Sequence, residues 1–343
     1  MSEADTVYPV PAEFAATANL SPETYKVMYE RSISDPEGFW AEHGKRLDWM
    51  TPYTTAKKTS WEQGDFQIEW YADGVLNVSA NCLDRHLEAR GDKAALIWEG
   101  DSPDESRTLT YRELHAEVCR FANVMKKLGV KKGDRVTIYM PMILEASYAM
   151  LACARIGAIH SVVFGGFAAA ELATRIDDAA PKLIISASCG IEPGRIVEYK
   201  PLLDEAIELS KNKPERTIIL QREQSRCELT KDRDLDYDQV VGAAKESGAS
   251  QPCVPVKSTD PLYILYTSGT TGKPKGVVRD NGGHAVAMHY SMAALYGMSA
   301  GDVFWAASDV GWVVGHSYIV YAPLLKGCTT ILYEGKPVGT PDA

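Results

Sequence analysis

A loop of small hydroxyl residues, glycines and lysines follows an apolar run near residue 267. Residues 263–276 read Tyr-Ile-Leu-Tyr-Thr-Ser-Gly-Thr-Thr-Gly-Lys-Pro-Lys-Gly, and the apolar start is typical of a strand. Gly269 and Gly272 permit backbone shapes that a side chain would forbid, so successive N–H groups can converge on one anion. The loop therefore predicts a phosphate-binding site, made of Thr267, Ser268, Gly269, Thr270, Thr271, Gly272, Lys273 and Lys275.

The spacing of this loop differs from the G-x-x-x-x-G-K-[ST] pattern of P-loop enzymes. Gly269 and Gly272 stand too close together, and Pro274 follows the lysine where a helix would have to continue. The alternative reading is a flexible linker, but a linker needs neither the lysines nor the apolar run before them. We therefore expect a different class of nucleotide enzyme.

Composition is that of an ordinary enzyme chain. Its 343 residues are 45% hydrophobic and 24% charged, which suffices for a large core or two domains. The formal net charge of −10 disfavours nucleic acid as a ligand, so the basic residues Lys273, Lys275 and Arg279 stand out as a local cluster. We expect a small anionic ligand.

Cysteine usage and the N-terminus indicate a reducing compartment. The seven cysteines form no C-x-x-C pair, which favours reduced, buried thiols, and no His, Cys and carboxylate cluster has the spacing of a zinc site. The first residues lack both a basic start and an apolar h-region. Residues 146–173 are apolar, but Arg155, Gly157 and His160 interrupt them, which favours a buried helix and strand over a membrane span. These features predict a cytoplasmic protein with no membrane segment.

Strand and helix patterns alternate from residue 110 onward. Thr110-x-x-Glu113 is a capping box, and the apolar spacing after it predicts a helix over 111–128, stopped by Gly129. Further helices are expected at 144–156, 168–179, 198–212, 284–296 and 315–326. Strands are expected at 135–140, 160–164, 183–187, 217–220, 262–267, 303–307 and 329–333. This alternation predicts an α/β fold of mostly parallel sheets flanked by helices, with ligands at the carboxyl ends of the strands.

Two stretches fall outside that alternation. Residues 1–85 are rich in aromatic side chains but show little periodicity, so we expect a segment that wraps around the domain and has no core of its own. The charged residues 221–238 are expected to be a solvated excursion between two units of the sheet.

As a whole, the loop at 267–276 resembles the signature loop of the acyl-adenylate-forming (AMP-binding) family, which includes acyl-CoA synthetases, luciferases and adenylation domains of peptide synthetases. The resemblance implies attack of a carboxylate on the α-phosphate of ATP, with Mg²⁺ bound to the ATP phosphates. Such catalysis consists of holding the polyphosphate and screening its charge while diphosphate departs. It needs no covalent nucleophile, and no catalytic residue or metal ligand is assigned within the chain.

The resemblance covers nearly the whole chain and narrows to short-chain acyl-CoA synthetases. Residues 308–318 (Ser-Asp-Val-Gly-Trp-Val-Val-Gly-His-Ser-Tyr) and 332–338 (Leu-Tyr-Glu-Gly-Lys-Pro-Val) carry it. Residues 1–85 look like the N-terminal extension of this subgroup, and 86–343 look like its large AMP-binding domain. The resemblance places four residues in the acyl pocket and at the approach to a thioester tunnel: Trp312, Val313, Val314 and His316. An apolar wall of this kind discriminates acids by single methylenes, at about 1 kcal/mol each.

Two earlier pieces resemble the coenzyme A site of the same enzymes: Phe164, Gly165 and Gly166, and then Glu192, Pro193, Gly194 and Arg195. Paired glycines let a backbone approach a ligand closely, and an arginine suits a phosphate.

Three departures point away from the acetate type. Acetate enzymes tend to have Arg where Glu192 stands, Thr where Val314 stands, and a Thr-Gly-Gly-Tyr stretch where residues 280–284 read Asp-Asn-Gly-Gly-His. The sequence looks more like the propionate branch, so we expect propionate to be favoured over acetate. Whether Glu192 contributes to adenine recognition stays open.

Several of these residues also have a purely structural reading. Gly165 and Gly166 are compatible with an ordinary turn after a strand, Arg195 with a surface arginine, and Trp312 with core packing. His316 is compatible with a core histidine. Four other histidines are expected to be structural: His86, His115, His160 and His289.

In the family, the chain continues beyond the position of residue 343 into a ribose-binding aspartate, a hinge and a small C-terminal lid with the adenylation lysine. The resemblance thus implies that this sequence is the first half of an acyl-CoA synthetase, without the lid and inactive by itself. The alternative is a non-catalytic module that binds a nucleotide or coenzyme A.

Overall fold

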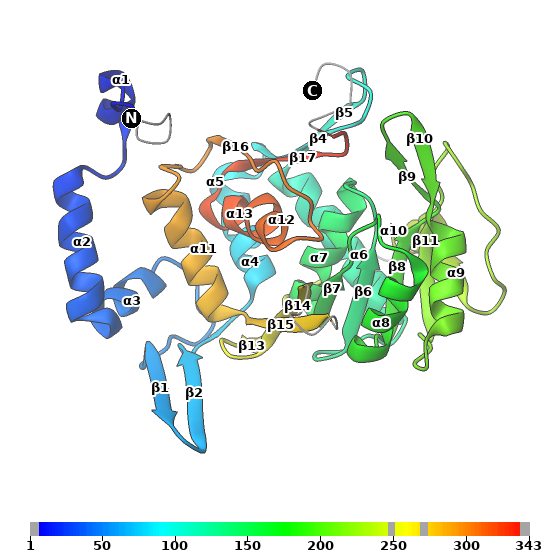
Figure 1. Ribbon diagram of the computed structural model, residues 1–343, viewed down its shortest axis with the longest axis horizontal. Helices are drawn as coiled ribbons and strands as arrows, with labels where there is room; N and C mark the ends of the chain where they lie inside the picture. The colour runs from blue at the N-terminus through cyan, green and yellow to red at the C-terminus, as the bar shows by residue number, and fades with distance from the viewer. Residues whose placement is uncertain (1–6, 246–250, 268–273, 337–343) are drawn as a thin grey trace.

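The computed structural model describes residues 7–245, 251–267 and 274–336, and two β-sheets form its frame (Figure 1). The larger sheet has seven strands. In spatial order they are β12 (Asp234–Asp236), β11 (Arg216–Leu220), β8 (Leu183–Ala187), β6 (Arg135–Tyr139), β7 (Ile159–Val162), β14 (Pro261–Thr267) and β15 (Lys275–Asp280). Neighbours run parallel except β14 and β15, which are antiparallel. The predicted α/β class is confirmed.

Both faces of the large sheet are covered, because successive side chains of its buried strands enter different cores. Ile184 and Ile219 belong to one apolar cluster, whereas Ile185 and Ile218 belong to the other. The helices that pack into these clusters are α8 (Ala169–Ala179) and α9 (Tyr199–Leu209) with the first pair, and α6 (Tyr111–Lys127), α7 (Leu144–Ile156) and α10 (Tyr237–Lys245) with the second. This two-sided burial explains why the strands read as continuous apolar runs.

The smaller sheet has four strands in the order β16-β17-β4-β5. They are β16 (Val303–Trp305), β17 (Thr329–Tyr333), β4 (Ala94–Glu99) and β5 (Ser106–Thr110). The helix α13 (Ala322–Lys326) packs on β17 and on α11 (Gly282–Ala294). The carboxyl end of β17 is tied to the large sheet, because Glu334 forms a buried ion pair with Arg222, at 2.5 Å, just after β11.

The N-terminal residues pack on α11 and on neighbouring helices, and buried side chains among them, such as Leu47 and Tyr71, join the main apolar cluster. Their elements are α1 (Ala12–Thr17), α2 (Pro22–Ser34), α3 (Pro36–Gly44), the hairpin β1 (Lys57–Glu62) and β2 (Asp65–Trp70), β3 (Val75–Leu76), which pairs with β13 (Val256–Lys257), α4 (Val78–Cys82), the 3₁₀ turn η2 (Asp84–His86) and α5 (Leu87–Arg90). α1 and α2 bury no residue and lie at the outer end of the molecule in Figure 1. The helix α3 contacts α11 through aromatic side chains. The ring centroids of Phe39 and Trp40 lie 5.7 and 5.3 Å from the ring centroid of Tyr290 on α11.

The apolar stretch at residues 146–173 forms most of α7, then β7 and the start of α8. Arg155, which interrupts it, is 3% exposed and donates two hydrogen bonds to the carboxylate of Asp84, at 2.7 and 2.9 Å. Within the described ranges, none of the helices combines the length and the apolar character that crossing a bilayer requires.

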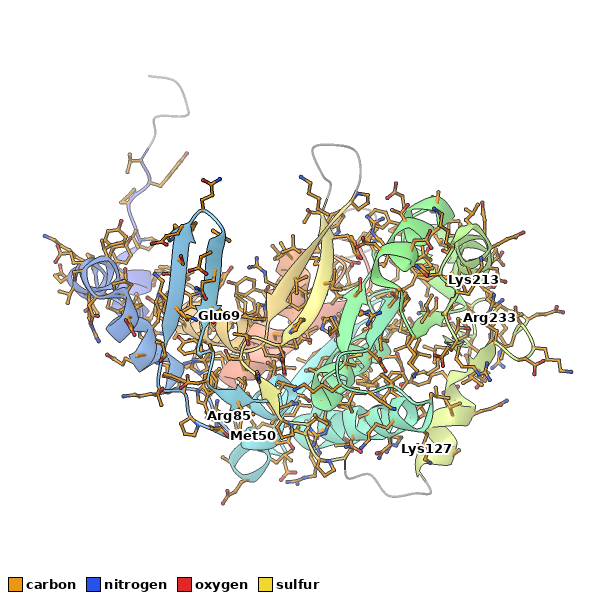
Figure 2. All side chains as sticks on the ribbon, turned by 90° about the horizontal axis from the view of Figure 1, so that it is seen from below. Met50, Glu69, Arg85, Lys127, Lys213 and Arg233 are labelled. Carbon is orange, nitrogen blue, oxygen red and sulfur yellow. The ribbon has the colours of Figure 1, made fainter. Side chains whose placement is uncertain are left out.

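Residues 221–238, predicted to be a solvated excursion, are ordered at their end, so that prediction was wrong in part. Residues 234–236 form the edge strand β12, and Tyr237 begins α10. Asp234 is held there by Lys200, at 3.1 Å, and by Arg233, at 2.6 Å. Figure 2 shows Arg233 at the end of the molecule that carries this edge. The charge of Asp234 looks solvated in the sequence because one of its partners, Lys200, lies on another element, α9.

Some boundaries also differ from the predictions. The single helix expected at 315–326 is three pieces, namely α12 (Val313–Gly315), a π-helical turn η3 (His316–Tyr321) and α13. Ten of the described strands were not predicted. Seven of them are β1 to β5, β12 and β13, and the other three are β9 (Cys189–Glu192), β10 (Arg195–Glu198) and β15. β9 and β10 form a hairpin, and β15 returns along β14.

Two glycines allow close backbone contacts in the segment at 308–318, Gly311 with the main chain of Phe164 and Gly315 with the segment's own Asp309 and Val310. A Cβ on Gly311 would lie 2.8 Å from the Cα of Phe164. A Cβ on Gly315 would collide with the carbonyl oxygen of Asp309 and lie 2.7 Å from the nitrogen of Val310. Real Cβ atoms do not approach backbone so closely, so any side chain here displaces the main chain.

We expect Gly315→Ala to lower the free energy of unfolding by about 1–3 kcal/mol, because the added methyl group has only backbone to displace. Gly242→Ala is the matched control, since Gly242 lies within α10 and its Cβ would meet nothing within 4 Å. That substitution should stabilise by about 0.5–1 kcal/mol through helix propensity. Urea unfolding of both variants checks the pair, and equal effects would contradict the packing argument.

Candidate functional site

The predicted phosphate loop is anchored by two strands of the large sheet. Thr267 ends β14 and Lys275 begins β15; the two residues are paired across the sheet, and both are exposed. The residues between them that were predicted to bind phosphate lie outside the described residues: Ser268, Gly269, Thr270, Thr271, Gly272 and Lys273. The anchors place the loop at the carboxyl end of β14, where open parallel sheets bind ligands.

The Phe164 turn, the first predicted coenzyme A piece, leaves the strand next to this loop. Phe164, Gly165 and Gly166 follow β7, which runs parallel to β14, so both loops start from the same edge of the sheet. Gly166 is exposed, whereas Gly165 is buried. A Cβ on Gly165 would collide with the hydroxyl of Tyr199, so neighbouring packing already requires glycine there.

Tyr199 brings the second predicted piece next to the first. Its hydroxyl would also lie 2.7 Å from a Cβ on Gly190, in the strand β9 that leads to Glu192. Tyr199 begins α9 directly after β10 and is 6% exposed. One buried ring therefore fills the space between the Phe164 turn and the β9–β10 hairpin.

Arg195 in this hairpin is not a free cation. Its guanidinium donates two hydrogen bonds to one carboxylate oxygen of Glu192, at 2.8 and 2.5 Å. The two residues face each other across the strands, and Pro193 and Gly194 make the turn between them, with a φ of +75° at Gly194. The Arg195 side chain is 70% exposed, so the pair is a surface ion pair that a ligand can reach.

The segment at 308–318 places side chains on two opposite sides, one toward the Phe164 turn and the other toward a cavity. Trp312 lies against the Phe164 turn, with ring centroids 5.7 Å from Phe164 and 6.3 Å from Phe167. Val313 and Val314 line a cavity of about 450 Å³ on the other face. All three side chains are about half exposed. The same short stretch thus borders the cavity and the turn.

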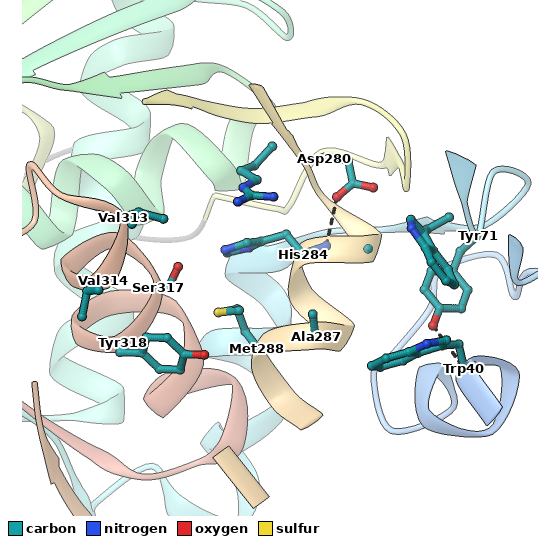
Figure 3. A pocket seen from close by; sticks show the side chains of 13 residues that line it. Trp40, Tyr71, Asp280, His284, Ala287, Met288, Val313, Val314, Ser317 and Tyr318 are labelled. Atoms are coloured by element: carbon teal, nitrogen blue, oxygen red, sulfur yellow. Dashed lines mark hydrogen bonds between the residues drawn. The ribbon is translucent and has the colours of Figure 1, made fainter. Parts of the chain in front are cut away.

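The cavity lies between this segment, α11 and the N-terminal residues (Figure 3). Figure 3 shows Val313, Val314 and Tyr318 on one side, His284 and Met288 of α11 in the middle, and Tyr71 and Trp40 opposite. Its full lining is Trp40, Trp70, Tyr71, Arg279, Asp280, Gly283, His284, Ala287, Met288, Val313, Val314, Ser317 and Tyr318. Most of these side chains are apolar or aromatic, so the cavity suits an apolar group.

Charge in the cavity is confined to one end of β15. Arg279 and Asp280 are the charged residues of the lining. Asp280 accepts a hydrogen bond from the backbone N–H of His284 at 2.9 Å, and burial raises the pKa of its carboxyl group. Burial, helped by Arg279, lowers the pKa of His284 to about 3, so this imidazole is neutral at pH 7. The cavity therefore has a guanidinium and a carboxyl group at one end, beside an apolar wall.

His316 was predicted to line the acyl pocket, but it lies outside the cavity lining. The side chain is 0% exposed and stacks behind the segment, with its ring centroid 4.7 Å from Tyr263 and 5.4 Å from His160. Val313 and Val314, which lie in the short helix α12, line the cavity instead. The predicted role of His316 in the acyl pocket stays a prediction.

A smaller cavity of about 120 Å³ adjoins the segment at its other end. Ser308, Asp309 and Lys336 are among its lining residues. Asp309 accepts a hydrogen bond from the backbone N–H of Gly311 at 2.6 Å, and the ammonium of Lys336 lies 5.8 Å from the Phe164 ring. Burial raises the pKa of the Asp309 carboxyl group, opposed by Gly311 and Lys336.

Sequence reasoning missed the part of the large cavity that comes from distant elements. Trp40, Trp70 and Tyr71 were predicted only as members of a wrapping segment, yet they form one wall. Arg279 was noted for its charge alone. A signal did exist for α11, because residues 280–284 depart from the usual family pattern, and both Asp280 and His284 prove to line the cavity.

Comparison with protein families gives two matches. Residues 83–343 match the family described as AMP-binding enzyme, and residues 25–82 match the one described as acetyl-coenzyme A synthetase N-terminus.

Curated relatives agree with these families. The chain is 50% identical over 340 residues to the acetyl-coenzyme A synthetase of Novosphingobium aromaticivorans, covering 99% of this chain and 52% of that protein. It is 52% identical over 331 residues to the acyl-CoA synthetase short-chain family member 3, mitochondrial, of Rattus norvegicus, covering 96% and 47%. The corresponding human protein is 51% identical over 330 residues, covering 96% and 47%. The chain thus spans about half the length of the curated relatives it matches.

Proposed function

The chain belongs to the family of AMP-binding enzymes, and from that membership we propose that it carries the phosphate, acid and coenzyme A sites of an ATP-dependent short-chain acyl-CoA synthetase. The reaction would join a carboxylate to the α-phosphate of ATP with release of diphosphate. Coenzyme A would then displace AMP from the acyl-adenylate to give acyl-CoA. The observation that carries the proposal is the segment at 308–318, which borders the large cavity with Val313 and Val314 and the Phe164 turn with Trp312.

The phosphate role rests on charge and position. Lys275 is exposed at the start of β15, opposite Thr267, so both side chains are accessible to a ligand at the carboxyl end of β14. Cationic and hydroxyl donors there would neutralise charge as diphosphate leaves. Mg²⁺ is proposed to arrive with the ATP phosphates.

The acid site is proposed at the Val313 and Val314 wall. An apolar wall beside a cation suits a carboxylic acid with a short alkyl chain. Val314 replaces the hydroxyl-bearing residue of the acetate type with a branched hydrocarbon of similar size, which supports propionate over acetate. We also keep the division into an N-terminal extension, residues 1–85, and an AMP-binding domain, residues 86–343, as part of this proposal.

The proposed reaction can be tested with the full-length product of the gene. The assay measures acid-dependent exchange of diphosphate into ATP. We expect exchange with propionate, and a reduction of about 10- to 150-fold in Lys275→Ala through loss of a charge-assisted contact of about 1.5–3 kcal/mol. Lys182→Ala is the control, because Lys182 precedes β8 at the amino edge of the same sheet and pairs with Asp134 and Glu215. No exchange in the unaltered protein would reject the function, and equal losses in the two variants would reject the phosphate role of Lys275.

The size of the preferred acid substrate tests whether Val314 lines the acid site. Val314→Ala should shift the kcat/KM ratios of acetate, propionate and butyrate toward the longer acids, with about 1–3 kcal/mol of altered discrimination from the vacated methyl groups. Val303→Ala is a matched control, since Val303 is 56% exposed on β16 and does not line the cavity. Unchanged ratios in Val314→Ala at full activity would remove Val314 from the acid site.

The Glu192–Arg195 pair gives a test of the coenzyme A site. The carboxylate of Glu192 occupies the guanidinium that a phosphate of coenzyme A would need. Because exposed ion pairs contribute at most about 1 kcal/mol, we expect Glu192→Gln to tighten coenzyme A binding by up to about fivefold. The gain should shrink as salt is raised.

Glu198→Gln is the matched control, because Glu198 ends the same hairpin but its carboxylate accepts from Ser225, at 3.2 Å. Calorimetric titration with coenzyme A compares the two variants. Equal affinities in Glu192→Gln, Glu198→Gln and the unaltered chain would show that the ligand does not use Arg195.

A further inference from the structure

We propose that Arg279 binds the carboxylate of the acid substrate, and that the strand β15 aligns this contact with the phosphate-binding Lys275. The inference rests on the proposed function and names the residue that recognises the group shared by all the acids. Three features of the structure support it: the face of β15 on which Arg279 lies, the groups around its guanidinium, and the residues that share this face.

The pairing of β14 with β15 fixes the face on which Arg279 lies. Arg279 is paired with Tyr263, and directly opposed residues of an antiparallel pair point to the same face of a sheet. Tyr263 is 0% exposed, and its ring centroid lies 5.3 Å from that of His284 on α11 and 4.7 Å from that of His316. Arg279 therefore lies on the face that α11 and the segment at 308–318 cover, where it lines the large cavity.

The other charged residue of the cavity lining is engaged by a helix. Asp280 accepts a hydrogen bond from the backbone N–H of His284 at 2.9 Å, and one of its carboxylate oxygens would lie 2.6 Å from a Cβ on Gly283. Figure 3 shows the first of these contacts at the start of α11. The Asp280 carboxyl group is thus directed to the first turn of α11.

The guanidinium of Arg279 is accessible to a ligand. Its side chain is exposed, and within the described part of the chain it takes part in no ion pair. A guanidinium carries five N–H donors in a planar fork that matches a carboxylate. Pairing with a carboxylate is stronger beside apolar groups than in water, because the surrounding dielectric constant is lower. The position of Arg279 at one end of an apolar cavity therefore favours an anionic group attached to an apolar chain.

The remaining groups of the lining suit that combination. Burial, helped by Arg279, lowers the pKa of His284 to about 3, so its ring is neutral and adds no second cation at pH 7. Ser317 offers a hydroxyl, while Val313 and Val314 form the apolar wall. An acid whose carboxylate pairs with Arg279 can extend its alkyl chain along this wall. The cavity thus separates recognition of the carboxylate from recognition of chain length.

The strand β15 carries both anion contacts on one face. Residues two apart on a strand share a face, so Arg279, Val277 and Lys275 point to the same side, and the register with β14 is regular over this stretch. Four residues of strand span about 13 Å, which separates the acid contact from the proposed phosphate contact by roughly the length of two extended side chains. A carboxylate held by Arg279 through one oxygen keeps the other oxygen for attack on the α-phosphate.

The test compares Arg279→Gln and Arg279→Lys in the full-length product of the gene, with acetate, propionate and butyrate as substrates. Loss of the charged contact in Arg279→Gln should raise the KM of each acid by about 10- to 100-fold and leave the KM of ATP unaltered. Lysine keeps the charge but not the planar fork, so the values for Arg279→Lys should lie between those of the unaltered protein and Arg279→Gln. Because the three acids share the carboxylate, the ratios of their kcat/KM values should stay the same.

Arg216→Gln is the matched control. Arg216 is exposed at the start of β11, at the amino edge of the same sheet, and its guanidinium donates to the backbone carbonyls of Glu215 and Asp232, at 3.0 and 2.7 Å. This variant should leave the KM of every acid unaltered. Unaltered acid KM values in Arg279→Gln, or an equal rise in both glutamine variants, would overturn the proposal. A rise confined to one acid would also overturn it, because it would assign Arg279 to the alkyl chain.

A second readout does not depend on turnover. Calorimetric titration of the same protein with propionate and with the uncharged propionamide separates the carboxylate from the alkyl chain. The unaltered protein should bind propionate at least about 10-fold more tightly than propionamide, and Arg279→Gln should lose this preference. Equal binding of the two compounds by the unaltered protein, or an undiminished preference in Arg279→Gln, would overturn the proposal.

The two readouts also distinguish failure of this proposal from failure of the proposed function. A preference for propionate that depends on Arg279, in a protein without acid-dependent exchange, would reject the proposed reaction and keep Arg279 as a carboxylate site. Exchange with unaltered acid KM values in the variants would keep the reaction and reject the role of Arg279. If Arg279→Gln does not fold, Arg279→Lys decides by the same measurements.

Discussion

Close packing of one short segment between the two sheets is the constraint on which the candidate site depends. A side chain on Gly311 would collide with the main chain of Phe164, and a side chain on Gly315 would collide with the main chain of Asp309. No side chain fits at either position, so the observed course of the segment requires glycine at both. That course sends Trp312 to the Phe164 turn, and Val313 and Val314 to the large cavity. The spacing of glycines in Gly-Trp-Val-Val-Gly thus has a steric cause, and the two faces of the segment are its consequence.

Burial separates the polar groups of the molecule into two classes. Histidines in the interior are kept neutral, since desolvation lowers the pKa of His284 to about 3 and of His316 to about 4. Charged groups that are buried instead come in pairs, such as Arg222 with Glu334 and Arg155 with Asp84. Lys275 is an exposed cation at the carboxyl edge of the large sheet, where β15 begins. Positive charge is thus available to an anionic ligand at that edge, while the stacked rings beneath it remain uncharged.

The departures from the acetate pattern fall at positions that line the large cavity or form the β9–β10 hairpin. Val314 and His284 both line the large cavity, although they lie on different elements. Glu192 sits opposite Arg195 and binds its guanidinium, so a substitution in this hairpin changes the charge that a phosphate would meet. Tyr199 connects the hairpin to the Phe164 turn by filling the space between Gly165 and Gly190. Substitutions that look separate in the chain therefore act on one connected region.

The sequence by itself determined the elements whose signals are local. The capping box at Thr110, the alternation of strands and helices and the position of the loop after β14 were all predicted, because capping, periodicity and glycine content act within a few residues. Tertiary structure alone decided the features that need a distant partner. Asp234 forms an edge strand through Lys200, the wall of the large cavity includes Trp40 and Trp70, and His316 lies behind that wall and not in it. Ion pairs, stacking and shared cavities join residues far apart in the chain, and their geometry is set only when the two sheets pack together.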